Sequence, residues 1–221
     1  MPTEVHVHRA ETGALAGLLF RRARIIQFLH NDASGLLGPN SDSYWKHIPK
    51  LYATLERFAL RRSILCILFS IRDAGRVRSM HDEVLAVETW FDDKVFFPDP
   101  AKQRDDDLKI LMVGRLEAQK DPLLAIKTMA KVLEMHPQSQ LEIVGVGSLE
   151  EEMVREARRL GVDGHMLFRG SLPRSAVADA MRESDVLLMT SHYEGSPRVI
   201  VEASACGLPI ACTSGADPDG R

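Results

Sequence analysis

Residues 185–206 read DVLLMTSHYEGSPRVIVEASAC, a stretch that predicts a buried strand over 185–190, an acidic loop, and a helix over 198–206. Two glutamates in this stretch, Glu194 and Glu202, have seven residues between them. Free N–H groups at a helix N-terminus bind anions, whereas a carboxylate in front of them suits hydroxyl groups. The stretch therefore suits a ligand in which a phosphate is joined to a sugar.

The same alternation of strand and helix continues on both sides of this stretch in the second half of the chain. Further strands are expected over 108–113, 141–144, 166–168 and 209–212, and further helices over 121–136, 149–160 and 174–182. Asp121 and Pro122 give the first of these helices an N-cap followed by a proline at its first position. Alternation with helices of this length predicts parallel strands joined by right-handed crossovers, with ligands bound beyond the carboxyl ends of the strands.

The first half of the chain repeats the pattern less regularly. Strands are expected over 5–9, 24–29, 63–70 and 84–90, and helices over 15–22, 44–62 and 72–81. The pattern breaks over residues 91–107, which contain Pro98, Pro100 and an acidic run. We therefore expect an α/β protein with a first domain over 1–98, a linker over 99–107 and a second domain over 108–221.

Composition sets the broad class of the protein. The chain has 221 residues, 45% of them hydrophobic and 27% charged, which is typical of a soluble globular protein. Its net charge of −3 provides no global field to attract nucleic acid. Three cysteines do not form a complete set of pairs, and no apolar stretch approaches the ~20 residues of a membrane-spanning helix. We expect a cytoplasmic protein without a signal peptide.

Charged and glycine residues follow the strands of the second half. Gly114, Arg115 and Lys120 come after the strand at 108–113, so a tight turn carries two cations suited to phosphate oxygens. Taken singly, such cations are usually solvated surface charges. Because parallel strands end at the same edge of a sheet, we expect this loop to lie close to the acidic loop after residue 190.

The glycines after the strand at 141–144 have two interpretations. Gly145 and Gly147 form a turn at which the backbone approaches a ligand or a helix. They do not complete a dinucleotide-binding fingerprint, because its third glycine would fall at Glu150, whose carboxylate would repel a pyrophosphate. We therefore expect no dinucleotide site here.

Six short motifs follow one another along the second half of the chain. They are VGRL at 113–116, QKDP at 119–122, IVGVG at 143–147, FRG at 168–170, SHYEGSP at 191–197 and VEASACGLP at 201–209. This set resembles the donor-binding domain of the retaining glycosyltransferases of family 4, the group 1 glycosyltransferases. These enzymes have the GT-B fold of two facing Rossmann-like domains. The first half resembles the acceptor-side domain more weakly, mainly through Phe28-Leu-His30. The resemblance implies transfer of a sugar, with retention, from a nucleotide-diphosphate-sugar donor.

The resemblance also implies a role for each matching residue. Arg115 and Lys120 would hold the donor diphosphate beside the turn at Gly114. Glu194 would contact the hydroxyls of the transferred sugar, and Glu202 those of the ribose. Arg169 and Gly170 would border the base, and His30 would contact the sugar from the opposite domain. The sugar and phosphate would also contact the backbone of Gly195, Ser196, Pro197, Arg198 and Val199.

No metal or other cofactor is expected, because two basic side chains can neutralise a diphosphate. The acidic run at 105–107 invites a metal-binding interpretation, but its place in the linker favours a solvated charge cluster. His6 and His8 alternate on the first strand and would share one face, where a metal site is a weaker alternative to a partly exposed strand.

The chain also departs from the family pattern. Its first half lacks the opening strand, glycine-rich loop and first helix of the family, and its second half ends soon after the last strand, so it resembles a central fragment. Two alternatives to transfer therefore stay open: a non-catalytic nucleotide-sugar binder, and a sugar-nucleotide epimerase or phosphorylase of the same fold. The sequence does not identify the acceptor. A basic face containing Arg21, Arg22, Arg24, Arg61 and Arg62 is compatible with peripheral contact with the inner face of the membrane.

Overall fold

The computed structural model describes residues 3–30, 33–39, 41, 43–101 and 107–217. Asn31 and Asp32, which follow the predicted second strand, lie outside the described residues, as does most of the acidic run at 104–107. The chain forms two compact units, the first made mainly of residues 1–89 and the second mainly of residues 90–193 and 197–217.

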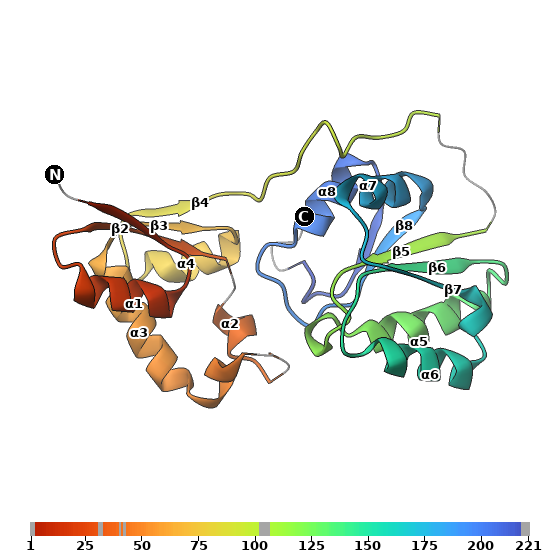
Figure 1. The fold of residues 1–221 in the computed structure, drawn as a ribbon, viewed down its shortest axis with the longest axis horizontal. Helices are drawn as coiled ribbons and strands as arrows, with labels where there is room; N and C mark the ends of the chain where they lie inside the picture. The colour runs from red at the N-terminus through yellow and green to blue at the C-terminus, as the bar shows by residue number, and fades with distance from the viewer. Residues whose placement is uncertain (1–2, 31–32, 40, 42, 102–106, 218–221) are drawn as a thin grey trace. The chain divides into compact units, whose positions relative to one another are not determined.

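The first unit contains a parallel sheet in the order β1-β2-β3-β4. The strands are β1 (Glu4–Val7), β2 (Arg24–Leu29), β3 (Ser63–Leu68) and β4 (Val84–Ala86). The helices are α1 (Ala10–Leu19), α2 (Ala33–Leu36), α3 (Pro49–Arg62) and α4 (Ile71–Arg78), with a 3-10 turn η1 (Tyr44–His47) (Figure 1). All four strands expected from the sequence are present in parallel pairing, as predicted.

The helix expected over 15–22 begins earlier, at Ala10, and ends at Leu19. Small residues explain the shift, because α1 buries Gly13, Ala14 and Gly17. A Cβ atom on Gly17 would lie 3.0 Å from Cγ of Arg62 on α3. The two helices thus pack through small side chains. Leu19, which belongs to the apolar run that predicted this helix, is exposed instead.

The long helix expected over 44–62 is two elements, η1 and α3, separated at Ile48. Proline explains the break, since Pro49 has no N–H to continue a preceding helix and is favoured at the first helical position. Ser43 accepts a hydrogen bond from the Trp45 amide and caps the 3-10 turn.

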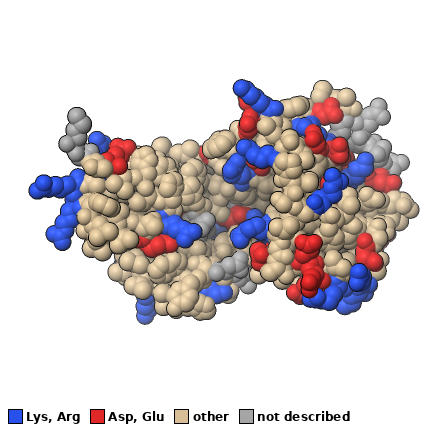
Figure 2. Space-filling view, viewed as in Figure 1, with Lys and Arg blue, Asp and Glu red and all other residues tan. Residues whose placement is uncertain are grey.

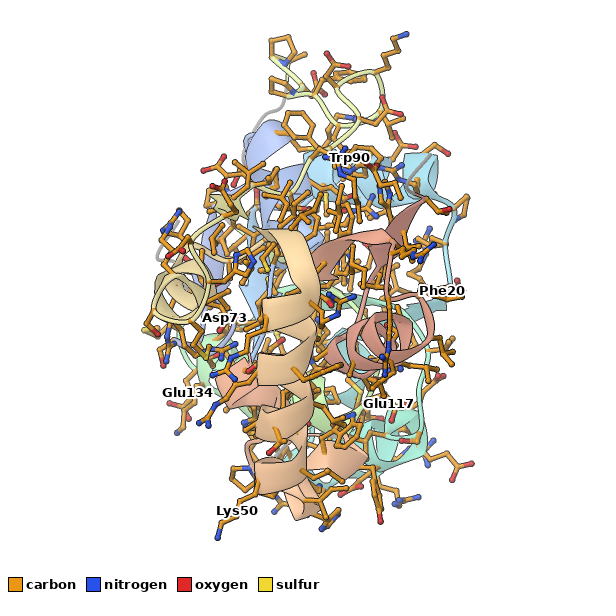
Figure 3. The ribbon with its side chains drawn as sticks, turned by 90° about the vertical axis from the view of Figure 1, so that its left-hand side faces the viewer. Phe20, Lys50, Asp73, Trp90, Glu117 and Glu134 are labelled. Atoms are coloured by element: carbon orange, nitrogen blue, oxygen red, sulfur yellow. The ribbon has the colours of Figure 1, made fainter. Side chains whose placement is uncertain are left out.

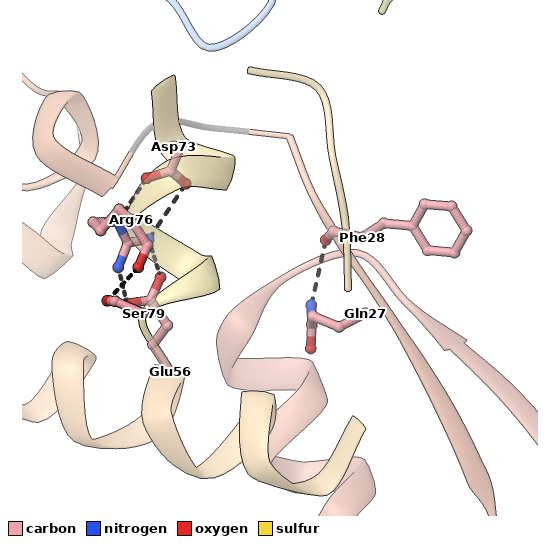
Figure 4. A network of polar contacts seen from close by, with 6 residues as sticks. All are labelled: Gln27, Phe28, Glu56, Asp73, Arg76 and Ser79. Atoms are coloured by element: carbon pink, nitrogen blue, oxygen red, sulfur yellow. Dashed lines mark hydrogen bonds and ion pairs between the residues drawn. The ribbon is translucent and has the colours of Figure 1, made fainter. Parts of the chain in front are cut away.

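An arginine between two buried carboxylates joins α3 to α4 (Figure 4). Arg76 donates to both carboxylate oxygens of Glu56, at 2.9 and 2.8 Å, and to Asp73 at 2.6 Å. Both acids are buried, at 5% and 3% exposure. Burial alone would lower the pKa of the guanidinium, but the hydrogen bonds that it donates to Glu56 and then Asp73 raise that pKa above its ordinary value. The cluster therefore depends on a permanent positive charge.

Replacing Arg76 by alanine is expected to destabilise the protein by about 3–5 kcal/mol, because it leaves two buried carboxylates without their cation. Urea unfolding followed by circular dichroism measures the change. The matched control is Arg78→Ala on the same helix, whose side chain is exposed, with an expected effect within about 0.5 kcal/mol. Equal unfolding midpoints for the two variants would show that the cluster contributes nothing to stability.

The second unit contains a parallel sheet in the order β7-β6-β5-β8-β9. Its strands are β5 (Lys109–Val113), β6 (Gln140–Val144), β7 (Met166–Gly170), β8 (Val186–Met189) and β9 (Ile210–Cys212). Its helices are α5 (Pro122–Leu133), α6 (Glu150–Leu160), α7 (Arg174–Glu183) and α8 (Arg198–Ala205), with 3-10 turns η2 (Ala118–Lys120) and η3 (Asp163–His165). Two parallel sheets with connecting helices confirm the predicted α/β fold class.

Helices cover both faces of this second sheet, with α5 and α6 on one side and α7 and α8 on the other (Figure 1). Successive β5 residues point into different cores. Leu111 packs in the cluster with α7 and α8, whereas Ile110 and Met112 pack in the cluster with α5 and α6. The strand order reverses direction between β5 and β8, the position at which doubly wound sheets bind ligands at the carboxyl ends of their strands.

Residues 90–98, which the sequence placed in the first domain, belong to the second unit. Phe96 explains the difference, because it is 2% exposed and lies in the same core cluster as Met181 and Leu208. Prolines suggested the boundary at 98, but burial of this aromatic ring places the division nearer residue 90. None of the helices in the described residues is long and apolar enough to cross a membrane.

Candidate functional site

The loop after β5 carries the first part of the site. An ideal Cβ atom on Gly114 would lie 3.5 Å from Cε of Lys120, so the lysine side chain lies across the turn. Arg115 is exposed, and its Nη2 donates to Oε1 of Gln119 at 3.3 Å. The structure therefore brings the two predicted cations and their glycine together in residues 114–120, which we call the basic loop.

The loop after β8, residues 190–197, carries Glu194 and is hydrogen-bonded to the basic loop. Nε2 of Gln119 donates to the Tyr193 carbonyl at 3.1 Å, and the His192 amide donates to the Gln119 carbonyl at 2.9 Å. Oγ1 of Thr190 donates to the Lys120 carbonyl at 2.8 Å. We call residues 190–197 the acidic loop. Its backbone and that of the basic loop are held together through Gln119, whose role the sequence did not indicate.

The glycines after β6 permit close packing between backbones. A Cβ on Gly145 would lie 1.8 Å from the Gly114 carbonyl oxygen, and one on Gly147 would lie 2.4 Å from the Leu116 carbonyl oxygen. The Gly145 amide donates to the Gly170 carbonyl at 2.8 Å. In addition, Ser148 donates to Glu117, from its backbone amide at 3.0 Å and its hydroxyl at 2.7 Å. These contacts tie the loops after β5, β6 and β7 into one edge.

Helix α8 begins at Arg198, directly after the acidic loop, with Pro197 at its N-cap. The predicted donor-binding backbone at Gly195–Val199 therefore lies at a helix N-terminus, as expected. Oγ of Ser196 is buried and has no hydrogen-bond partner among the described residues. A helix N-terminus next to a buried hydroxyl without a partner is suited to an anionic ligand that carries hydroxyl groups.

Glu202 lies one turn into α8 between two arginines. Arg174 Nη2 is 3.4 Å from Oε1 of Glu202, and Arg198 Nη2 is 3.6 Å from the same oxygen. Burial raises the pKa of the Glu202 carboxyl, and the two arginines oppose that shift. The guanidinium of Arg198 also lies over the ring of Trp90, 5.2 Å from its centroid; Trp90 is labelled in Figure 3.

The sequence reasoning missed Arg174 and Trp90. The sequence did contain a signal for Arg174. It is the first residue of α7, where the positive end of the helix dipole disfavours a cation. Such a position favours an anionic neighbour, here the carboxylate of Glu202. Trp90 gave no comparable signal, since it lies in a segment without regular periodicity.

Three further predicted positions lie outside the basic and acidic loops. Arg169 is on β7, where its Nη1 is 3.7 Å from Oε1 of Glu142, and it lines a cavity of about 590 Å³ with Lys109 and Arg182 rather than the loop edge. Gly170 ends β7 at the carboxyl edge, with φ of +64°. His30 belongs to the first unit, directly after β2. The structure therefore separates Arg169 from the loop residues while keeping Gly170 beside Gly145.

The charges of the molecule are mixed. On the face drawn in Figure 2, basic and acidic side chains are interspersed over the surface. Among the residues that the structure describes, no group of three or more His, Cys, Asp or Glu side chains is arranged to hold a metal ion. The absence of a metal requirement stays a prediction.

A comparison with known protein families identifies the family of this chain. Residues 93–218, more than half of the chain, match the sequence profile described as glycosyl transferases group 1. The chain belongs to the group 1 glycosyltransferases. The matched segment contains both the basic loop and the acidic loop, so the resemblance found in the sequence motifs is confirmed.

Curated relatives of this glycosyltransferase chain include an uncharacterized glycosyltransferase of Methanocaldococcus jannaschii, 32% identical over 224 residues. That match covers 95% of the chain and 57% of the relative. A D-inositol 3-phosphate glycosyltransferase of Kribbella flavida is 34% identical over 120 residues, covering 50% of the chain and 28% of the relative. The chain thus spans little more than half, or less, of the length of these relatives.

Solved structures share the fold across both units. Sucrose-phosphate synthase from Thermosynechococcus elongatus matches 97% of the chain and 56% of its own, with a TM-score of 0.79 and 19% identity. Anabaena HepE in complex with UDP-glucose matches 96% of the chain and 61% of its own, with a TM-score of 0.75 and 20% identity. At these identities the likeness concerns the fold, and it confirms the GT-B architecture of the glycosyltransferase chain.

Proposed function

We propose that this protein transfers a sugar from a nucleotide-diphosphate-sugar donor to an acceptor, with retention of the anomeric configuration. The observation that carries the proposal is the hydrogen bonding through Gln119, which joins the basic loop to the acidic loop at the N-terminus of α8. This edge offers cations and backbone amides for a diphosphate, and carboxylates for the hydroxyls of the attached sugar and ribose. HepE, a protein of the same fold, has been solved with UDP-glucose, which supports this ligand class.

The proposed chemistry is electrostatic. When the glycosidic bond to the donor diphosphate breaks, negative charge grows on the phosphate and positive charge grows on the anomeric carbon. Arg115, Lys120 and the amides at the start of α8 would stabilise the leaving diphosphate, because preorganised donors at a developing anion lower the barrier. No metal or other cofactor is needed in this proposal, since the two side chains supply the neutralising charge.

Each remaining residue has a proposed part in donor binding. Glu194 would accept hydrogen bonds from the transferred sugar, and the hydroxyl of Ser196 would gain the partner that it lacks among the described residues. Glu202 would turn from its two arginines to the ribose hydroxyls. His30 would contact the transferred sugar. Gly170 would border the base through its backbone, with Arg169 nearby on the same strand.

We also propose a cytoplasmic location with peripheral contact with the inner face of the membrane. Cys66, Cys206 and Cys212 are all free thiols, which suits a reducing compartment. Leu19 and Phe20 are 65% and 54% exposed at the end of α1, immediately before Arg21 and Arg22; Phe20 is labelled in Figure 3. Apolar side chains beside arginines suit an anionic bilayer surface, and failure to co-sediment with anionic vesicles at low salt would contradict this contact.

An assay of the full chain with UDP, GDP and ADP sugars tests the proposed function. Nuclear magnetic resonance follows both the nucleoside diphosphate released and the anomeric configuration of the product. We expect one donor class to be consumed with retained configuration, and an inverted product would contradict the mechanism. Donor binding without turnover would favour the non-catalytic binder, and epimerised nucleotide sugar would favour the epimerase.

A further inference from the structure

Five aromatic rings follow one another along one face of the first sheet. His6 lies against Phe28 on β2 with ring centroids 5.6 Å apart, and Phe28 stacks on His8 at 4.8 Å. His8 lies beside His30 with ring centroids 5.2 Å apart, and His30 stacks on Phe69 at 4.6 Å. The ring planes of the last three pairs lie within 15° of parallel. The His8 and His30 imidazoles therefore lie between the rings of Phe28 and Phe69.

A hydrogen bond joins the two central imidazoles. Nδ1 of His8 and Nε2 of His30 are 2.9 Å apart, so one ring donates its N–H and the other accepts. The lone pair of an imidazole nitrogen lies in the ring plane, and the planes of these rings differ by only 15°. The bond therefore occupies Nε2 of His30, while Nδ1 of His30 has no hydrogen bond to any residue that the structure describes.

The surroundings of the pair act on its protonation. Burial lowers the pKa of His30, and the neighbouring charge of His8 lowers it further. The other titratable groups on the adjoining segment are paired with each other. His6 Nε2 is 2.9 Å from Glu4, and Arg9 is 3.7 Å from Glu11. The pair therefore favours a neutral His30 over a wider pH range than an isolated imidazole allows.

We propose that His8 is a positioning residue, which fixes the ring orientation of His30 and engages its Nε2, so that Nδ1 is the nitrogen presented to a ligand. The inference rests on the proposed function, in which His30 contacts the transferred sugar. A neutral imidazole with one nitrogen engaged by a partner presents a single defined hydrogen-bonding atom. Without His8, the ring could present either nitrogen and could rotate between Phe69 and solvent.

Two substitutions of His8 separate its hydrogen bond from its ring. Asparagine places an amide atom near the position of Nδ1, so His8→Asn retains the bond and loses the stacking. Phenylalanine retains the stacking and loses the bond. His6→Ala is the matched control, because His6 lies on β1, two residues before His8, and its hydrogen bond is to Glu4. Nitrogen-15 resonances of His30 in the full chain report its tautomer and its pKa.

In His8→Phe we expect the His30 tautomer populations to change, because the bond is lost, and the pKa of His30 to rise, because the charge of His8 is lost. In His8→Asn the pKa should also rise, while the tautomer preference stays close to that of the wild type. His6→Ala should leave both unchanged. Identical His30 resonances and titration in His8→Phe and wild type would overturn the proposal.

Turnover gives a second readout. The kcat of His8→Phe is expected to fall on the order of tenfold or more with KM little changed, because a misplaced contact group acts on the reacting geometry, and His8→Asn should recover most of that loss. Equal kcat losses in the two variants would assign His8 a merely structural part and overturn the proposal. If no donor is turned over by the wild type, the proposed function fails, while the nitrogen-15 comparison still decides the role of His8.

Discussion

Replacing Lys120 by alanine is expected to lower the rate of sugar transfer about 10²- to 10³-fold, the usual effect of removing one preorganised donor at a developing anion. The Lys120 side chain lies across the turn at Gly114, at the carboxyl end of β5. The Thr190 bond to this residue uses the Lys120 backbone carbonyl. The substitution therefore removes a charge without removing that link between the basic and acidic loops.

The measurement is kcat and KM with the best donor of the nucleotide-sugar panel. Lys127→Ala is the matched control, because Lys127 is an exposed lysine on the adjacent helix α5. Its kcat should match that of the wild type. A Lys120→Ala enzyme with unchanged kcat, and with an unaltered circular dichroism spectrum, would show that this lysine does not stabilise the leaving diphosphate.

Replacing Glu202 by alanine is expected to weaken nucleotide binding about 10- to 100-fold, since hydrogen bonds to a charged group contribute about 1.5–3 kcal/mol. The same change leaves Arg174 and Arg198 without their shared carboxylate, which could strengthen phosphate binding and mask the loss. A comparison between ribonucleotide and 2′-deoxyribonucleotide removes this complication, because both ligands carry the same phosphates.

Calorimetry with the two nucleotides provides the decisive comparison for Glu202. The wild type should prefer the ribonucleotide, and Glu202→Ala should lose most of that preference. Glu134→Ala is the control, because Glu134 is exposed and pairs only with Lys131 among the described residues. A preference that survives in Glu202→Ala would assign the ribose to another acceptor.

The sequence predicted most of the second unit, because its signals were local. The strand at 185–190 and the helix at 198–206 match β8 and α8 to within one residue at each end. Asp121 caps α5 as expected, accepting a hydrogen bond from the Leu124 amide while holding a left-handed conformation. Each of these elements has a continuous apolar run or a specific cap, so tertiary packing did not need to override local preference.

The first unit was harder to predict, because its packing depends on distant residues. Helix α1 is placed by small residues that fit against α3, a contact 45 residues away along the chain at Gly17 and Arg62. Phe96 shows the same limit, because only the assembled core assigns its segment to the second unit. The sequence pattern shows which residues are apolar, but it does not show which residues they pack against in the folded core.

The candidate site shows a similar division between local and distant information. The cations and carboxylates stood out through their places after strands, and the structure brings their loops together. The prediction for Arg169 rested on the same kind of signal, but Arg169 lies within β7 rather than after it. Its side chain is close to Glu142 on the neighbouring strand. Gln119 carries no charge and follows no strand directly, so nothing in the sequence marked it as the link between the basic and acidic loops.

The central claim is that the carboxyl edge of the second sheet binds a nucleotide-diphosphate sugar through the basic loop. Isothermal titration of the full chain with UDP, GDP and ADP sugars, repeated with Lys120→Ala and Lys127→Ala, tests it most directly. The account predicts saturable binding of at least one donor class, weakened by Lys120→Ala and unaffected by Lys127→Ala. Binding of no donor in the panel, or equal binding by all three proteins, would contradict it.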